Sequence, residues 1–125
     1  VMRLMSFAMT TAQVLDGTKH VTRRRGWWKL QPGSEIQAVE KSMGLKKGER
    51  VKVLRQLRVY DVRIEPLERM VLEPDYGRLE CRLEGFPDLS PQAFVEMFCA
   101  SHGCVPADPV MRIAFAYVDG HGDGC

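Results

Sequence analysis

A long β-favouring stretch at residues 51–64 constrains the fold of this chain more than any other feature. Its apolar side chains alternate at Leu57 and Val59 and then continue in a shifted phase at Val62 and Ile64. A slip in phase indicates a β-bulge or a sharp bend, and a strand needs such bends when its sheet closes toward a small barrel. The stretch therefore predicts a curved sheet.

Turn and capping signals divide the rest of the chain. Strands are expected at residues 3–7 and 35–41, and residues 20–24 should run extended. A short helix is expected between them, beginning at Thr10 or Thr11 and ending at Gly17. Beyond Pro66 the pattern changes to helix, and residues 111–117 alternate as a last strand. This order favours an α+β domain whose sheet curls into a small β-barrel with flanking helices.

Two later helices carry apolar side chains at helical spacing. The first covers residues 76–83 and stops at Gly85, whereas the second is opened by Ser90 and Pro91 and ended by Gly103. We expect these helices to bury the side chains of Tyr76, Leu79, Leu83, Phe94, Met97 and Phe98.

Length and composition favour one domain. With 125 residues, 45% of them hydrophobic, we expect residues 1–118 to form a single unit and the glycine-rich residues 119–125 a flexible tail. No apolar run approaches the roughly 20 residues that cross a bilayer, and the N-terminal residues lack the pattern of an export signal. We therefore expect a cytoplasmic protein without membrane contact.

Charge is unevenly distributed along the sequence. Residues 1–60 hold 13 Lys and Arg against 4 Asp and Glu, a net +9, whereas residues 61–125 hold 5 against 12, a net −7. Such polarity is typical of a domain that presents a basic face to phosphates, unless the fold intermingles the two halves. Within the basic half, Lys46, Lys47, Arg50 and Lys52 either extend such a face or keep a sheet edge soluble.

Cysteines in the second half raise the question of a metal. Cys99, His102 and Cys104 lie close in sequence, with Cys81 as a further potential ligand. However, the four-residue gap between Cys99 and Cys104 exceeds the usual two-residue spacing of a zinc knuckle, and free cysteines are commonly buried. We favour buried thiols and predict no metal site and no cofactor.

The segment at residues 16–28, DGTKHVTRRRGWW, is the strongest functional signal. Consecutive cations do not suit an apolar core and adjacent indoles do not suit a solvated surface, so the combination predicts a surface that holds an anion and stacks a flat ring, as in a nucleotide or nucleic acid. Strand alternation prevents Arg23, Arg24 and Arg25 from all facing one way. We expect Arg24 to face the ligand, and Arg23 and Arg25 to be either ligand contacts or solvated charges.

Two further kinds of side chain are candidate ligand contacts. One of Trp27 and Trp28 should seal the core while the other offers a stacking platform. Glu40 lies at a strand parity that would aim it inward, where a buried carboxylate needs a cation such as Lys19 or Arg24.

These motifs together resemble the ASCH domain family, a branch of the PUA-like superfamily, in its small single-domain phage and bacterial type. The resemblance rests on Gly17-x-Lys19-x-x-Thr22-x-Arg24, Gly26-Trp27-Trp28, Pro32-Gly33, Glu84-Gly85-Phe86 and Phe115-x-Tyr117. It implies a PUA-like β-barrel with flanking helices and a cleft that binds RNA or a modified nucleoside.

One branch of that family is similar to acetylcytidine amidohydrolase, whose lysine, threonine and glutamate match Lys19, Thr22 and Glu84 here. In that interpretation Thr22 attacks the amide, Lys19 takes its proton and Glu84 protonates the leaving nitrogen, or the same cleft cleaves RNA. The alternative is a noncatalytic RNA-binding module with a basic cleft. Lys19 and Thr22 have opposite strand parity, so they meet only if the turn at Gly17 reorients Lys19.

Overall fold

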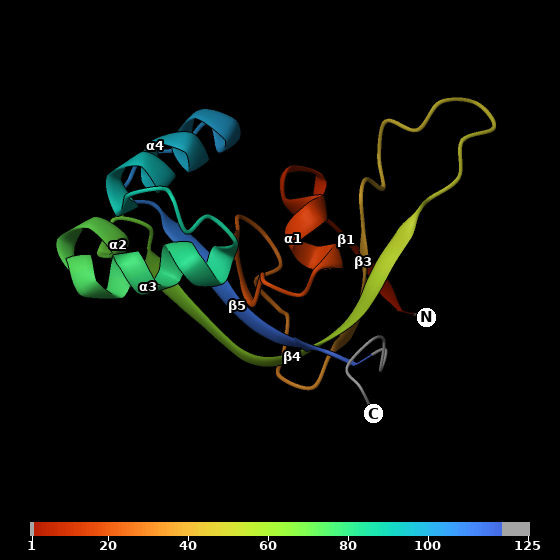
Figure 1. Cartoon of the computed structure of the whole chain (residues 1–125), viewed down its shortest axis with the longest axis horizontal. Helices are drawn as coiled ribbons and strands as arrows, with labels where there is room; N and C mark the ends of the chain where they lie inside the picture. Colours follow the sequence, from red (N-terminus) through yellow and green to blue (C-terminus); the bar gives the residue numbers. More distant parts are fainter. Residues whose placement is uncertain (1, 119–125) are drawn as a thin grey trace.

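Five strands form one mixed sheet in the computed structural model, which describes residues 2–118 (Figure 1). Their order across the sheet is β1 (Arg3–Ser6), β3 (Glu35–Val39), β4 (Val53–Pro66), β5 (Pro109–Tyr117) and β2 (Val21–Arg24). β1 pairs with β3 in parallel, and the other pairs are antiparallel. The sheet curls into a half-barrel with β1 and β2 as its edge strands, which confirms the predicted α+β class.

The bend in the sheet lies where the phase slip predicts it. The register between β4 and β5 shifts between Val59 and Asp61, and both strands curve together along the underside of the view in Figure 1. Before the shift Leu57 and Val59 are buried, whereas near the end of the strand Ile64 is exposed and Glu65 is buried. The last part of β4 thus turns the charged side chain of Glu65 inward, toward Tyr76 in the helical part of the molecule.

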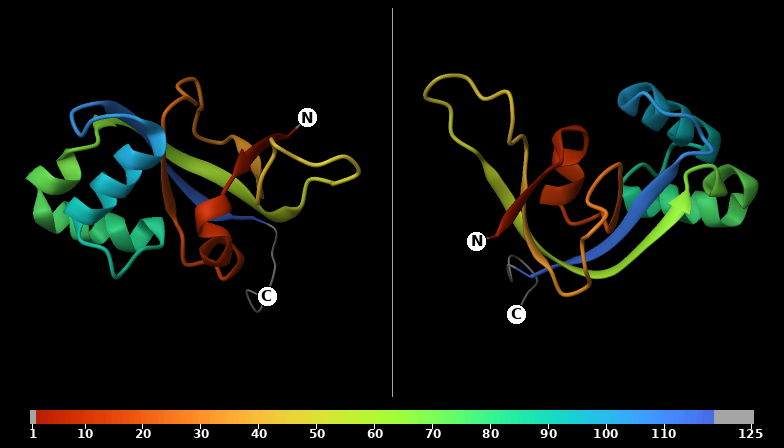
Figure 2. Two further views of the ribbon diagram at one scale, coloured as in Figure 1. Left: turned by 90° about the horizontal axis from the view of Figure 1, so that it is seen from above. Right: turned by 180° about the vertical axis from the view of Figure 1, so that it is seen from behind.

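The helices fall into two groups (Figure 2). A single 3₁₀ turn, η1 (Ala8–Thr10), leads into α1 (Thr11–Leu15), which lies over the hollow of the curved sheet. At the other end of the molecule lie α2 (Arg69–Leu72), α3 (Pro74–Glu84) and α4 (Pro91–His102). α2 is a short element that the sequence patterns did not predict.

The predicted caps of α4 and α3 are confirmed. Ser90 Oγ accepts a hydrogen bond of 3.1 Å from the backbone N–H of Ala93, and Gly103 ends α4 in the left-handed conformation. Gly85 does the same for α3, with φ of 96°. None of the helices among residues 2–118 has the length and apolarity needed to span a bilayer, and the predicted tail at 119–125 lies outside the described residues.

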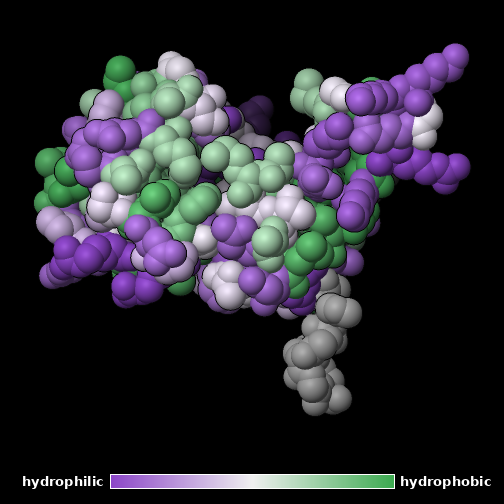
Figure 3. Space-filling model, turned by 45° about the horizontal axis from the view of Figure 1, so that its top comes forward, coloured by the Kyte–Doolittle hydropathy of each residue, from purple (hydrophilic) through white to green (hydrophobic). Residues whose placement is uncertain are grey.

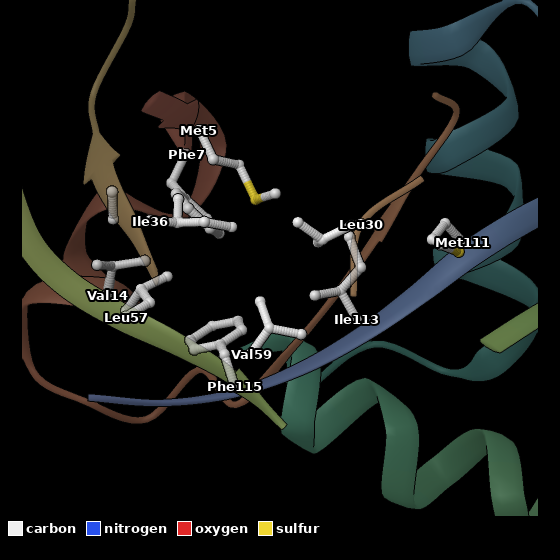
Figure 4. Packing of buried hydrophobic residues seen from close by; sticks show 11 residues of the cluster. Met5, Phe7, Val14, Leu30, Ile36, Leu57, Val59, Met111, Ile113 and Phe115 are labelled. Atoms are coloured by element: carbon white, nitrogen blue, oxygen red, sulfur yellow. The ribbon is translucent and has the colours of Figure 1, made fainter. Parts of the chain in front are cut away.

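Two hydrophobic cores lie along the sheet, and both include side chains of the long strand β5. The core inside the half-barrel contains Met5, Phe7, Val14, Leu30, Ile36, Ala38, Leu57, Val59, Met111, Ile113 and Phe115 (Figure 4). The core beneath the helices contains Leu67, Met70, Cys81, Phe94, Val95, Phe98 and Val110. Each group of elements therefore buries its own apolar faces, as expected for helices and sheets that pack in layers.

A layer of buried charge joins α3 to the sheet. Arg23, Arg112 and Arg63 are neighbours across β2, β5 and β4, which places three cations side by side. Like charges at such short range repel unless carboxylates compensate them. Glu80 and Glu84 of α3 and Glu65 of β4 supply those carboxylates, and all three are buried.

The charge layer corrects the prediction for the buried face of α3. Leu79 is exposed and Tyr76 and Leu83 are only partly buried, whereas Gly77, Glu80, Cys81 and Glu84 face inward. The physical reason is that α3 covers arginines rather than an apolar surface. In α4 the prediction is confirmed, because Phe94 and Phe98 are buried and Met97 packs against them.

Candidate functional site

A cavity of about 220 Å³ lies between the edge strands β1 and β2 on one side and α3 and α4 on the other. Its polar lining includes Lys19, Thr22, Arg23, Arg24 and Glu84. Its apolar lining is rich in large side chains, namely Phe7, Met9, Phe86, Phe94, Met97 and Phe98. A hollow with aromatic walls and a few convergent polar groups is the usual form of a small-ligand site.

Lys19 is held by the turn that follows α1. Gly17 takes φ of 79°, and the backbone N–H of Lys19 then donates to the carbonyl of Gln13 at 3.2 Å, so the chain folds back onto the helix. Tyr117 Oη donates to the carbonyl of Lys19 at 2.6 Å. These contacts fix the backbone of Lys19 before β2 begins.

The side chain of Lys19 ends on Glu84, the last residue of α3. Lys19 Nζ donates to the backbone carbonyl of Glu84 at 2.6 Å and to Glu84 Oε1 at 2.9 Å. Burial lowers the pKa of Lys19, and the ion pair with Glu84 offsets only part of this effect. The chemical result is a lysine whose neutral amine form is easier to reach than in water.

Glu84 is shared between Lys19 and Arg23. Its second oxygen, Oε2, accepts from Arg23 Nη1 at 3.1 Å. Arg23 Nη2 in turn donates to Glu80 at 2.6 Å and to Glu65 at 3.1 Å. Arg23 is therefore committed to three carboxylates. Arg23 is buried, so the alternative that it is a solvated charge is wrong, whereas its contact with a ligand in the cavity that it lines stays a prediction.

Thr22 and Arg24 share the other face of β2, as strand alternation predicts. Arg24 Nε donates to Thr22 Oγ1 at 3.2 Å, and Arg24 Nη2 donates to the carbonyl of Ser6 at 2.6 Å. Its guanidinium carbon lies 4.7 Å from the centre of the Phe7 ring. Burial lowers the pKa of Arg24 to about 10, which still leaves it charged at neutral pH.

The geometry resolves the parity problem of Lys19 and Thr22. Lys19 precedes β2 and reaches the cavity from the turn, whereas Thr22 reaches it from the strand itself. β2 is an edge strand, and Thr22 and Arg23, which alternate along it, both line the hollow. Lys19, Thr22, Arg24 and Glu84 are thus brought together; their catalytic and ligand-binding roles remain predictions.

Arg25 and the two tryptophans lie away from this cavity. Arg25 is exposed and pairs with Asp108 at 3.4 Å. Trp27 packs against the core of the half-barrel, with Arg3 above its ring at 4.0 Å, and Trp28 is 44% exposed. The two indoles line a separate hollow of about 320 Å³ with Arg3 and Lys29. One tryptophan therefore packs inward and the other outward, and a stacking role for Trp28 stays a prediction.

Glu40 is exposed, so the prediction that it points inward to a cation is wrong. The register between β3 and β4 shifts between Ala38 and Val39. Because of this irregularity Val39 is buried next to Ala38, and the residue that follows faces solvent. The carboxylate that pairs with Lys19 is Glu84 instead.

Part of the uneven charge of the two halves is compensated in the folded structure. Arg23 from the basic half is neutralised by Glu65, Glu80 and Glu84 from the acidic half. The structure thus intermingles the halves within the charge layer.

The three cysteines within residues 2–118 are free thiols. Cys99 and Cys104 place their sulfur atoms 3.7 Å apart, and Cys81 is buried in the core beneath the helices. The ring of His102 stacks on Phe98 at 4.0 Å between ring centres. Among residues 2–118 no three His, Cys, Asp or Glu side chains are grouped as metal ligands would be.

Several residues around the site escaped the sequence reasoning. Arg112 binds Glu80 with hydrogen bonds of 2.6 and 3.0 Å, and Tyr76 donates to Glu65 at 2.7 Å. The available signal was the spacing of Tyr76, Glu80 and Glu84, which repeats every four residues along one face of a helix. That pattern is also typical of a solvated helix face, so it did not identify a buried one.

The half-barrel sheet, the helices at its end and the cavity between them define an ASCH-like fold of the PUA-like α+β type. The similarity is structural, because no family model and no curated protein matches the sequence. A protein of Enterococcus faecalis V583 assigned to the family DUF984 superposes with a TM-score of 0.57 at 15% identity, covering 93% of this chain and 76% of its own.

The ASCH domain from Lactobacillus crispatus JV V101 gives a TM-score of 0.56 at 14% identity and covers 93% of this chain and 79% of its own. At sequence identities this low, the similarity shows only that the fold is shared. The fold implied by the motif from Gly17 to Arg24 is therefore confirmed, while the activity implied by the same motif is a matter for proposal.

Proposed function

We propose that this chain binds a nucleoside of RNA in the cavity and hydrolyses an amide on its base, as in acetylcytidine. The observation that carries this proposal is the buried Lys19, whose pKa is lowered and which shares one cavity with Thr22 and Arg24. A buried lysine in a cleft, displaced from its ordinary pKa by burial and by a specific partner, is a candidate for proton transfer.

The dimensions and lining of the cavity suit a nucleoside. Its volume of about 220 Å³ lies below the roughly 300–1,000 Å³ of sites for drug-sized ligands. Phe7 and Phe86 place aromatic rings in the lining, and the guanidinium of Arg24 can donate to a carbonyl or phosphate oxygen. An acetylated cytosine presents both a flat ring and an amide carbonyl.

The chemistry follows from the positions of the polar groups. Lys19 as the neutral amine takes the proton of Thr22, and Thr22 Oγ1 attacks the carbonyl carbon of the acetyl group. Arg24, whose Nε lies 3.2 Å from Thr22 Oγ1, donates to the oxyanion that forms. Glu84 orients Lys19 and shares its proton, which returns to the leaving nitrogen as the C–N bond breaks. Water then releases acetate from Thr22.

Turnover of acetylcytidine tests this proposal. The purified chain is incubated with the free nucleoside and with an acetylated RNA, and the release of cytidine is followed by chromatography. Thr22→Val keeps the shape of the side chain but removes the nucleophile, so we expect loss of at least about a hundredfold in rate. Thr18→Val is the matched control, because Thr18 is exposed and its hydroxyl donates to Asp16 Oδ1.

Equal activity of Thr22→Val and Thr18→Val would refute the role of Thr22. Thermal unfolding of both variants is measured alongside, so that a loss of activity is not mistaken for a loss of folding. Labelled RNA in the same reactions reports strand cleavage, which would indicate a ribonuclease instead.

A noncatalytic RNA-binding module is the second candidate. The observation that favours it is that the polar groups of the cavity are satisfied by one another, since Lys19 binds Glu84 and Thr22 accepts from Arg24. Binding of RNA without any product, in the wild-type chain and in Thr22→Val alike, would select this candidate. Its affinity should then fall with rising salt, because phosphate contacts release counterions.

A further inference from the structure

A hairpin arm projects from the half-barrel between β3 and β4. We call residues 40–52 the basic arm, since β3 and β4 last pair at Val39 and Val53. The arm extends away from the body at the end opposite to α2, α3 and α4 (Figure 1, Figure 2). It carries five cations, Lys41, Lys46, Lys47, Arg50 and Lys52, against two carboxylates, Glu40 and Glu49.

Most of these cations are left to the solvent. Glu49 pairs with Lys41 at 3.3 Å and accepts from the backbone N–H of Lys46 at 2.8 Å, which occupies the carboxylate nearest to the arm's tip. The ammonium and guanidinium groups of Lys46, Lys47, Arg50 and Lys52 form no ion pair within residues 2–118, and all four residues are exposed. Figure 3 shows the arm as a hydrophilic projection with long side chains reaching outward.

Protection of a sheet edge does not explain this charge. β3 lies between β1 and β4, and β4 lies between β3 and β5, so neither strand that bears the arm is an edge strand. The edge strands are β1 and β2. The arm's lysines thus lie on neither edge strand, which argues against the alternative that they keep an open edge soluble.

The base of the arm is fastened to the rim of the cavity. Ser6 Oγ donates to the carbonyl of Glu40 at 2.8 Å, and the backbone N–H of Phe7 donates to the carbonyl of Val39 at 2.8 Å. Ser6 and Phe7 both line the cavity, and the carbonyl of Ser6 accepts from Arg24. A chain that leaves the cavity on this side therefore meets the arm.

We propose that the basic arm binds the phosphate backbone of a single-stranded RNA whose neighbouring nucleotide occupies the cavity. This inference rests on the proposed function and adds that the substrate is a strand rather than a free nucleoside. Six residues on each side of the arm reach up to about 20 Å when extended, enough for several consecutive phosphates. Exposed cations free of ion pairs gain the most from such contacts, because each displaces a counterion from the strand.

The test compares two variants with the same loss of charge. Lys46→Gln/Lys47→Gln removes two cations of the arm, and Arg58→Gln/Arg78→Gln removes two exposed cations of β4 and α3. Binding of a fluorescein-labelled single-stranded RNA of about 12 nucleotides, within the site sizes of small single-strand-binding domains, is measured by anisotropy across a salt series.

If each arm lysine contacts one phosphate, the arm variant should show a salt slope shallower than wild type by about 1.4, and its deficit in affinity should change about sevenfold between 50 and 200 mM salt. The control should keep the wild-type slope. Equal slopes for both variants, or no binding of the RNA by the wild-type chain, would overturn the proposal. Loss of binding to phosphatidylserine vesicles with unchanged RNA binding would also overturn it, because the arm would then be a membrane contact.

Turnover of free acetylcytidine separates this inference from the proposed function. We expect the arm variant to hydrolyse the free nucleoside at the wild-type rate while its kcat/KM on the acetylated RNA falls. Absence of turnover in every protein, with a slope that still depends on the arm, would refute the hydrolase and leave the arm's role standing. Normal turnover with no effect of the arm on either substrate would refute the arm alone.

Discussion

Replacement of Arg23 by methionine should destabilise the fold more than any neighbouring change. The guanidinium of Arg23 is completely buried and donates through Nη1 to Glu84 and through Nη2 to Glu65, Glu80 and Tyr76. It joins β2, β4 and α3 at one point. The carboxylates around it raise the pKa of Arg23 against the effect of burial, so the charged form is the one that the fold holds.

The size of the effect depends on which cations the three carboxylates still contact after Arg23 is replaced. Removing one partner of a buried ion pair typically costs about 3–5 kcal/mol, because the other charge remains buried. Here Glu84 keeps Lys19, Glu80 keeps Arg112 and Glu65 keeps Arg63. Arg23 Nε is also the one buried side-chain N or O atom among residues 2–118 without a hydrogen-bond partner. These facts point to the lower end, about 3 kcal/mol, or roughly 10–15 °C in Tm for a domain of this size.

Chemical and thermal unfolding of three variants measure the loss in the free energy of unfolding and in Tm. Arg25→Met is the matched control, because Arg25 is exposed and its single ion pair should contribute under about 1 kcal/mol. Arg23→Lys keeps the charge but loses the fork that spans three carboxylates, so it should fall between the other two. If Arg23→Met unfolds at the same temperature as Arg25→Met, the charge layer does not stabilise the fold and this reasoning fails.

Two more changes test the layer and the packing beside it. Burial raises the pKa of Glu65, but hydrogen bonds from Tyr76 and Arg63 outweigh it and bring the pKa to about 2. Because this folded-state pKa is depressed, the stability it contributes, on the order of 3 kcal/mol, is complete above about pH 4.5 and is lost as the pH falls toward 2. Between about pH 5 and about pH 3, the Tm of Glu65→Gln should therefore fall less than the Tm of wild type. Equal falls in Tm would contradict the lowered pKa of Glu65. A Cβ at Gly77 would lie 1.9 Å from the carbonyl oxygen of Met70 and 2.8 Å from Pro91 Cγ, so Gly77→Ala should cost about 1–3 kcal/mol or more in chemical unfolding, whereas exposed Arg78→Ala should cost under about 1 kcal/mol, and equal costs would contradict the close packing.

Local signals in the sequence predict the elements well because their causes are local. The cap at Ser90 needs only the backbone N–H of Ala93, three residues away. The bulge after Val59 follows from the alternation of side chains within one strand. The family motif from Gly17 to Arg24 likewise predicts the strand and the turn that position Lys19.

The buried charge layer could not be predicted in this way because its partners are distant in sequence. Glu80 meets Arg23 and Arg112 only after β2 and β5 have paired. Before that pairing is known, a glutamate at helical spacing is best interpreted as solvated, and the sequence pattern therefore predicts Leu79 on the buried face, although it is exposed. The prediction that Glu40 points inward is wrong for a related reason. Its orientation depends on the irregularity between Ala38 and Val39, which simple strand alternation does not include.

The charge layer and the proposed chemistry depend on each other through Glu84. The cavity is lined by three cations, Lys19, Arg23 and Arg24, and by the single carboxylate of Glu84. Arg23 occupies one oxygen of that carboxylate, which leaves Lys19 only the other oxygen and the backbone carbonyl. Burial lowers the pKa of Lys19, and the nearby Arg24 and Arg23 lower it further, while Glu84 offsets part of the effect. The same excess of positive charge suits a ligand that brings a carbonyl or phosphate oxygen, so the bridge that stabilises α3 on the sheet also prepares the cavity for the proposed substrate.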